Sequence, residues 1–193
     1  MYIDIPKNTR VIVLEGIAGS GKTTLLEYLK QQFKSSRVYV YLEQELLLGW
    51  KHVHIPHVSA LRIEFMNLFL DELEKNLEQK KEAIFILERF HLSMKILEWE
   101  FEKNFDIEYQ KIVERVKKLP VHVLISELRG KQIKERMHHR ERSRQWREYC
   151  EEKLVLRGFA DLESVSIAQQ EALFEAAQEQ GIPYSSVQVQ LNR

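Results

Sequence analysis

Eight residues near the start of the chain have types and a spacing suited to phosphate binding. They read Gly16-Ile17-Ala18-Gly19-Ser20-Gly21-Lys22-Thr23, which fits the pattern glycine, four residues, Gly-Lys-Thr. Glycines let the backbone turn several N–H groups inward, and the first turn of a following helix adds unpaired N–H groups and partial positive charge. We expect this phosphate loop and the next residue, Thr24, to bind ATP. Lys22 would reach the β- and γ-phosphates, and the Thr23 hydroxyl would complete the shell of a Mg²⁺ ion.

The flanks of the phosphate loop predict a strand before it and a helix after it. An apolar run at 11–14 indicates a buried strand over about 10–15. Leu25, Leu26 and Leu29 recur at helical spacing and predict a helix over 22–34. Because strand, loop and helix come in the order that phosphate binding needs, we favour this interpretation over a glycine-rich turn that only caps a helix.

Two carboxylates follow a second predicted strand at 37–42. Glu43 and Glu45 come directly after it, and Trp50 lies in an irregular stretch expected to reach Pro56. In an open α/β sheet, residues just beyond the carboxyl end of a strand line the ligand crevice. Glu43, Glu45 and Trp50 are therefore candidates for the acceptor site. A solvated loop with a packing tryptophan is an equal alternative.

A third predicted strand, at 83–87, is wholly apolar and is followed by Glu88 and Arg89. Phosphate-loop enzymes keep a second Mg²⁺ contact at this position, usually through water, which makes Glu88 the predicted metal residue beside Thr23. The alternative is an acidic helix-capping or surface residue. Arg89 would lie near the transferring phosphate.

Residues 129–147 form a basic segment. It holds eight Lys and Arg against two Glu, whereas the whole chain balances 29 basic with 29 acidic residues. A solvated amphipathic helix or a nucleic-acid patch would explain it. We favour a lid over about 129–158 whose arginines close over ATP and neutralise the transferring group. The candidate arginines are Arg136 and Arg140 for nucleotide binding, Arg140 and Arg144 for catalysis, and Arg142 nearby.

The remaining patterns predict the fold. Helices are expected over 58–80, in two pieces between 91 and 119, and over 166–180, where Ser166 caps the start and Gly181 follows the end. Further strands are expected at 121–125 and near 186–189. The alternation predicts an α/β fold of the phosphate-loop NTPase class: a three-layer sandwich with a five-stranded parallel sheet flanked by helices, in one domain over 1–193 with an Arg-rich helical lid. The expected apolar face of the 58–80 helix comprises Val58, Leu61, Phe65, Leu68, Phe69, Leu73 and Leu77.

Composition limits the other classes. The balanced charge gives no global field that favours nucleic acid. A single cysteine, Cys150, excludes an internal disulfide and fits a reducing compartment. Without the apolar run of a signal peptide or membrane span, the expected location is the cytoplasm and no membrane partner is expected. The histidines at 52, 54 and 57 match no metal-site pattern. The sequence leaves a homodimer open.

Three parts of the chain resemble the thymidylate kinase and deoxynucleoside kinase branch of the phosphate-loop kinases. They are residues 16–24, Glu88-Arg89-Phe90-His91-Leu92-Ser93 after the third strand, and the basic segment. Thymidylate kinases have Asp-Arg-aromatic, two residues, Ser at the second part, and deoxynucleoside kinases have Glu-Arg-Ser, so this chain is intermediate. Deoxynucleoside kinases also carry a glutamate base after the second strand, to which Glu43 or Glu45 looks similar although the proline that follows it there is absent.

The resemblance implies Mg²⁺- and ATP-dependent phosphoryl transfer to a small-molecule acceptor, a nucleoside or a nucleoside monophosphate. Glu43 or Glu45 would act as a base only on a neutral hydroxyl. A phosphate acceptor is already ionised and would need cations such as Arg62 or Arg89. The alternatives are a regulatory nucleotide-binding NTPase, a kinase with a non-nucleotide acceptor, and a nucleic-acid-binding protein.

Overall fold

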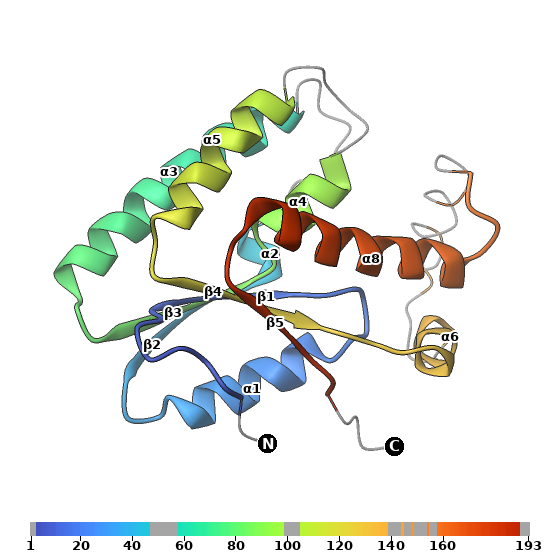
Figure 1. The fold of residues 1–193 in the computed structure, drawn as a ribbon, viewed down its shortest axis with the longest axis horizontal. Helices are drawn as coiled ribbons and strands as arrows, with labels where there is room; N and C mark the ends of the chain where they lie inside the picture. Colours follow the sequence, from blue (N-terminus) through green and yellow to red (C-terminus); the bar gives the residue numbers. More distant parts are fainter. Residues whose placement is uncertain are drawn as a thin grey trace.

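Five parallel strands form the centre of the fold (Figure 1). The computed structural model describes residues 3–46, 58–98, 105–138 and 158–189, together with Arg144, Glu148 and Leu154. The strand order is β2-β3-β1-β4-β5, and every neighbouring pair is parallel. The prediction of a five-stranded parallel sheet flanked by helices is therefore confirmed. The strands are β1 (Val11–Glu15), β2 (Arg37–Tyr41), β3 (Ala83–Glu88), β4 (Val121–Ser126) and β5 (Tyr184–Val187).

Helices cover both faces of the sheet (Figure 1). Side chains alternate along each strand, so Ile12 and Leu14 of β1 pack with Leu25 on one face, whereas Val11 and Val13 join the larger core on the other. Helix α1 (Lys22–Gln32) covers the first face. The other helices are α2 (Glu43–Leu46), α3 (Val58–Gln79), α4 (His91–Glu98), α5 (Phe105–Lys117), α6 (Lys131–Met137) and α8 (Leu162–Gln180).

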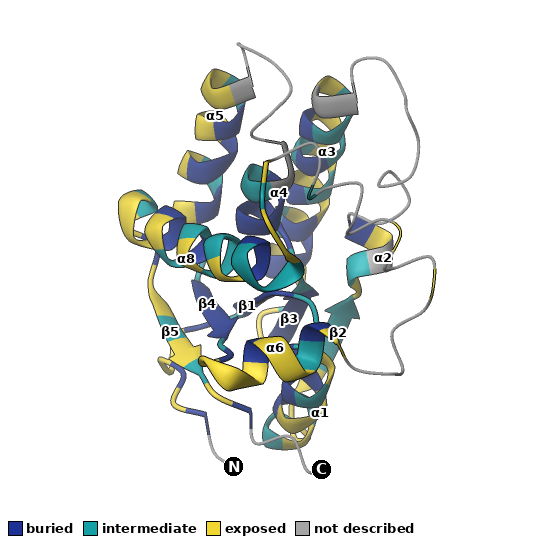
Figure 2. Ribbon diagram, turned by 90° about the vertical axis from the view of Figure 1, so that its right-hand side faces the viewer, coloured by how far each residue is buried: buried dark blue, intermediate teal, exposed yellow. Residues whose placement is uncertain are grey.

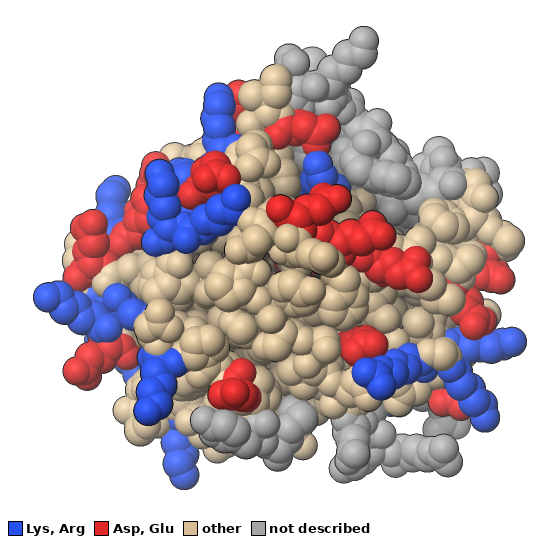
Figure 3. Space-filling view, viewed as in Figure 1, with Lys and Arg blue, Asp and Glu red and all other residues tan. Residues whose placement is uncertain are grey.

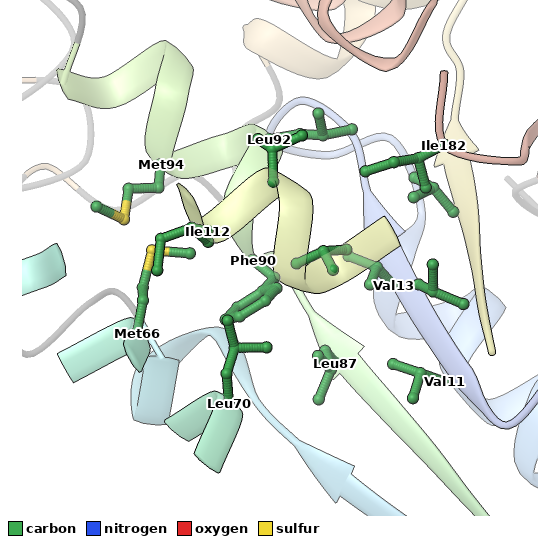
Figure 4. Close-up of a cluster of buried hydrophobic side chains, with 14 of the residues drawn as sticks. Val11, Val13, Met66, Leu70, Leu87, Phe90, Leu92, Met94, Ile112 and Ile182 are labelled. Atoms are coloured by element: carbon green, nitrogen blue, oxygen red, sulfur yellow. The ribbon is translucent and has the colours of Figure 1, made fainter. Parts of the chain in front are cut away.

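The larger core lies between the sheet and helices α3, α4, α5 and α8. Buried residues line the central strands β1, β3 and β4 and the inward sides of these helices, whereas exposed residues lie on the outer sides of the helices (Figure 2). The edge strands β2 and β5 are intermediate or exposed. Phe90, just after β3, points its ring toward Leu70 and Met66 of α3 and Ile112 of α5 (Figure 4). The carboxyl end of β3 is thus anchored in the larger core.

The predicted apolar face of α3 was wrong in part. Leu68 is 68% exposed, whereas Ile63, Met66 and Leu70 are buried. Leu73 and Leu77 are buried as expected. Helix α3 is apolar on more than one side, and packing against the sheet and Phe90 selects which side faces inward. Spacing within α3 alone does not carry that information.

Three further boundaries differ from the predictions. Helix α8 begins at Leu162, where Asp161 and Ser164 form a capping box, and Ser166 is buried inside the helix and donates to the Leu162 carbonyl. Strand β5 ends at Val187, two residues before the predicted end. The short helix α2 replaces the start of the expected irregular stretch. Gly181 caps the end of α8, as predicted.

Candidate active site

The phosphate loop joins β1 to α1 at the carboxyl edge of the sheet. Gly16 has φ +144°, and a Cβ there would lie 2.6 Å from both the Ser126 carbonyl oxygen and Ser20 Oγ. Only glycine fits this position. Gly21 is the N-cap of α1 and supplies no side-chain hydrogen bond to it. The first turn of α1 therefore keeps N–H groups that an anion could bind.

Two serines are buried at the phosphate loop, Ser126 beside it and Ser20 within it. Ser126, the last residue of β4, donates from Oγ to the Ser20 carbonyl oxygen at 2.7 Å. The Ser20 hydroxyl is buried and has no hydrogen-bond partner among the described residues. A buried hydroxyl of this kind calls for a partner, and an oxygen of a bound phosphate is one that the loop could supply.

Lys22 is buried beneath the phosphate loop. Its Nζ donates to the carbonyl oxygens of Gly16 and Ile17, each at 3.2 Å. Burial, with a smaller contribution from Arg89, lowers the pKa of Lys22 to about 7. The nearby carboxylates of Glu43, Glu88 and Glu15 oppose this shift. An anionic ligand in the loop would add to them and favour the charged ammonium.

Arg89 and Glu43 pair beside the phosphate loop, across the ends of β2 and β3. Arg89 Nε lies 3.1 Å from Glu43 Oε2, and the two side chains are 15% and 20% exposed. Glu45 has a different role, because its Oε2 accepts a hydrogen bond from the Leu42 backbone N–H at 2.7 Å. Of the two predicted carboxylates, only Glu43 faces Arg89.

Glu15 is a site residue that the sequence analysis missed. This last residue of β1 is fully buried, and its carboxylate accepts hydrogen bonds from the backbone N–H groups of Phe90 and Ser93 and from Ser93 Oγ. Burial raises the pKa of Glu15, while Ser93, Phe90 and Arg89 act in the opposite direction. Its place at a strand end could have marked Glu15 as a candidate, because the rule that selected Glu43 and Glu45 applies equally to it, but its partners could not be predicted from the sequence.

Comparisons with known proteins agree with this geometry at the level of fold. No protein-family profile matches the chain, and no curated protein sequence matches it significantly. Solved structures do match. A thymidylate kinase from Ehrlichia chaffeensis has 16% identity and a TM-score of 0.55, with 93% of this chain and 92% of that chain covered. The chain has the fold of the thymidylate and deoxynucleoside kinases.

Two other solved structures extend the comparison. The thymidylate kinase from Candida albicans has 13% identity and a TM-score of 0.55, covering 93% of this chain and 84% of that chain. The YorR protein from Bacillus subtilis, in complex with phosphorylated GDP, has 18% identity and a TM-score of 0.52, covering 92% of this chain and 84% of that one. The predicted resemblance to this kinase fold is confirmed.

Within this kinase fold, the predicted metal residues lie near the phosphate loop. Thr23 is exposed on the first turn of α1. Glu88 ends β3, and its carboxylate is close enough to Lys22 to oppose the lowering of the Lys22 pKa. No cluster of three or more His, Cys, Asp or Glu suited to a metal occurs among the residues with described positions. Two oxygen ligands fit Mg²⁺, which takes most of its shell from phosphates and water.

The basic segment is described only in part. Its first helix, α6, packs Ile133 and Met137 against Ile17 of the phosphate loop and Leu128. Arg136 is partly buried on α6, and Arg144 is exposed and paired with Glu148 at 2.7 Å. The start of the segment thus contacts the phosphate loop. Predicted site residues that lie outside the described part of the chain are Trp50, Arg140 and Arg142.

Acidic side chains gather over α8 on the face seen in Figure 3. This helix carries Glu163, Glu171, Glu175 and Glu179. Such a face would repel a nucleic-acid backbone.

The described helices include none with the length and apolar character needed to cross a bilayer.

Proposed function

We propose that this protein transfers the γ-phosphoryl group of ATP to a hydroxyl group of a nucleoside, with a nucleoside monophosphate as the second choice of acceptor. The observation that carries the proposal is the pairing of Glu43 with Arg89 beside a phosphate loop that contains a buried lysine. The loop supplies a site for the donor phosphates. The pair supplies a base and a cation at the adjacent strand ends.

The donor side consists of backbone and Lys22. The N–H groups of the phosphate loop and of the first turn of α1 would bind the phosphates, and Lys22 would exchange its carbonyl partners for phosphate oxygens. Thr23 and Glu88 would hold Mg²⁺, which neutralises phosphate charge when bound. Burial excludes water from Lys22 and strengthens its attraction for an anion.

The acceptor side consists of Glu43 and Arg89. Glu43 would accept the proton of the attacking hydroxyl, and Arg89 would stabilise charge that spreads over the transferring group. The negative charge of a phosphate acceptor would be repelled by the Glu43 carboxylate, and the positive charge of Arg89 is already paired with Glu43. This charge arrangement is the reason for ranking a neutral hydroxyl above a phosphate. The α6 contact with Ile17 supports the idea that the basic segment acts as a lid, with Arg136, Arg140 and Arg144 as its candidate cations.

The test is acceptor-dependent ADP formation. The purified protein is incubated with Mg-ATP and a panel of nucleosides, nucleoside monophosphates and other metabolites, and Lys22→Ala should abolish turnover. Glu43→Gln should lower kcat for a nucleoside by about 10²-fold or more, in the range of general-base catalysis. Glu45→Gln is the matched control, expected to change kcat by less than threefold because its carboxylate caps α2.

Two results would contradict the proposal. Equal losses in the Glu43 and Glu45 variants would remove Glu43 as the base. ADP formation that no acceptor stimulates would instead indicate a regulatory NTPase.

A further inference from the structure

Glu15 lies between two parts of the candidate site, the phosphate loop and the turn that carries Arg89. It ends β1 and directly precedes Gly16 of the phosphate loop. Its carboxylate reaches across to the turn between β3 and α4, the turn that carries Arg89. One side chain therefore connects the donor side of the site with the acceptor side.

The Glu15 carboxylate acts as a cap for α4 from a distant part of the sequence. Oε1 accepts from the Phe90 N–H at 2.9 Å and from the Ser93 N–H at 3.2 Å, and Oε2 accepts from Ser93 Oγ. These N–H groups belong to the start of α4, where a helix lacks internal partners and favours negative charge. Three donors satisfy the carboxylate in a place that excludes water.

These contacts fix the backbone of Arg89. Arg89 has φ +60°, the single non-glycine residue with positive φ in the described chain, and such a conformation persists only where its surroundings hold it. Its N–H donates to the Leu14 carbonyl oxygen at 2.8 Å. On its other side, Phe90 is held by Glu15 and by its ring in the core (Figure 4). Glu15 and the core together leave the Arg89 backbone one conformation.

We propose that Glu15 is a positioning residue for phosphoryl transfer that acts through Arg89. The proposal rests on the function proposed above, in which Arg89 faces the transferring group. Because its carboxylate is fully buried and accepts three hydrogen bonds, Glu15 would act without touching nucleotide or acceptor. Its effect is to hold the Arg89 guanidinium at a fixed offset from the phosphate loop, so that loop and cation reach the same phosphoryl group.

The Arg89 side chain lies between the phosphate loop and Glu43. Arg89 and Ser93 line a small cavity, of about 20 Å³, together with Gly16 and Ile17 of the phosphate loop. A shift of the turn would either close this space or break the ion pair with Glu43. Transfer rates depend steeply on such placement, whereas ATP affinity depends on the loop and Lys22.

The first experiment separates kcat from KM. Glu15→Gln keeps the size of the side chain and one acceptor oxygen but removes the charge. We expect kcat to fall at least tenfold while KM for ATP changes less than twofold. Ser93→Ala, which deletes a single donor, should give a smaller loss with the same pattern and is the second variant if the first does not fold. Glu27→Gln, at an exposed glutamate paired with Lys30 on α1, is the matched control and should leave both constants unchanged.

A double-mutant cycle with Arg89→Ala tests the route of the effect. If Glu15 acts through Arg89, then Glu15→Gln should lower kcat less than twofold once Arg89 has been replaced. An equal loss with and without Arg89 would overturn the proposal, as would a Glu15→Gln variant with wild-type kcat.

An activity-independent measurement keeps this inference separate from the proposed function. In ¹H–¹⁵N spectra, Glu15→Gln should shift the Arg89 Nε and Phe90 amide signals, and Glu27→Gln should not. If no acceptor stimulates ADP formation but these signals shift, the proposed function fails and the role of Glu15 in holding Arg89 stands. Unchanged Arg89 and Phe90 signals would overturn that role whatever the activity.

Discussion

Acid should destabilise this protein through one buried histidine, His91. Its ring is fully buried at the start of α4, and burial lowers its pKa to about 3, with a contact to Gln180 acting the other way. Tyr109 donates to the His91 carbonyl oxygen at 2.9 Å and receives a hydrogen bond from Gln180 at 3.0 Å. Because the ring is fully buried, bulk solvent cannot reach it to solvate an imidazolium.

The sign and size follow from proton linkage. The unfolded chain has an ordinary histidine pKa of about 6.5, so between pH 6.5 and 3 it binds one more proton at His91 than the folded chain does. The free energy of unfolding must therefore fall as the pH falls, and this contribution is fully present only above pH 6.5. The slope is about 1.4 kcal/mol per pH unit, which gives a loss of about 2 kcal/mol at pH 5 relative to pH 8.

Urea unfolding from pH 5 to pH 8 would measure this effect in the wild type and in His91→Asn. Whatever its stability at pH 8, the variant should lose about 2 kcal/mol less free energy of unfolding than the wild type between pH 8 and pH 5. The raised pKa of Glu15 makes its contribution to stability change with pH in the opposite direction. This contribution cancels when the variant is compared with the wild type, because both proteins contain Glu15. Parallel pH profiles for the two proteins would refute the reasoning.

Three further predictions concern the loop, a helix start and a helix face. Gly16→Ala should lower the free energy of unfolding by about 3 kcal/mol and abolish ATP binding, because backbone strain and overpacking add at this position. The control Gly181→Ala, which has open space around it, should lose about 1 kcal/mol in thermal unfolding. Similar losses in the two variants would contradict the close contact at Gly16. Asp161→Ala should cost about 1 kcal/mol by removing the α8 cap, and an unchanged unfolding midpoint would argue against the capping box. Leu70→Ala should cost about 3 kcal/mol in urea unfolding and Leu68→Ala less than about 0.5 kcal/mol, and the reverse order would mean that α3 packs by its other side.

The sequence predicted features that depend on local spacing. The phosphate loop, β1, β3 and the position of Glu88 all follow from patterns within a few residues, and the structure has them at those positions. The start of α8 was also local, because Asp161 and Ser164 have cap spacing, but Ser166 was chosen instead.

Features that depend on distant contacts could not be predicted. Glu43 and Glu45 are equivalent in the sequence, and they differ only because Arg89 arrives beside one of them. Glu15 gains its role from Phe90 and Ser93, which follow it by 75 and 78 residues. The roles of these residues in catalysis stay predictions until the variants are measured.

The strand order determines when the sheet can begin to fold during synthesis of the chain. Among the described strands, β1 pairs only with β3 and β4, and β2 pairs only with β3, so no pair of these strands can form before β3 has been made. On the ribosome, β1 and β2 therefore stay without a strand partner until β3 has been synthesised, and unpaired strands are prone to aggregate. The arrival of β3 then joins β1 and β2 in one step and brings Glu88 and Arg89 to the phosphate loop. Nascent chains released before this strand should have no nucleotide site and should depend on chaperones.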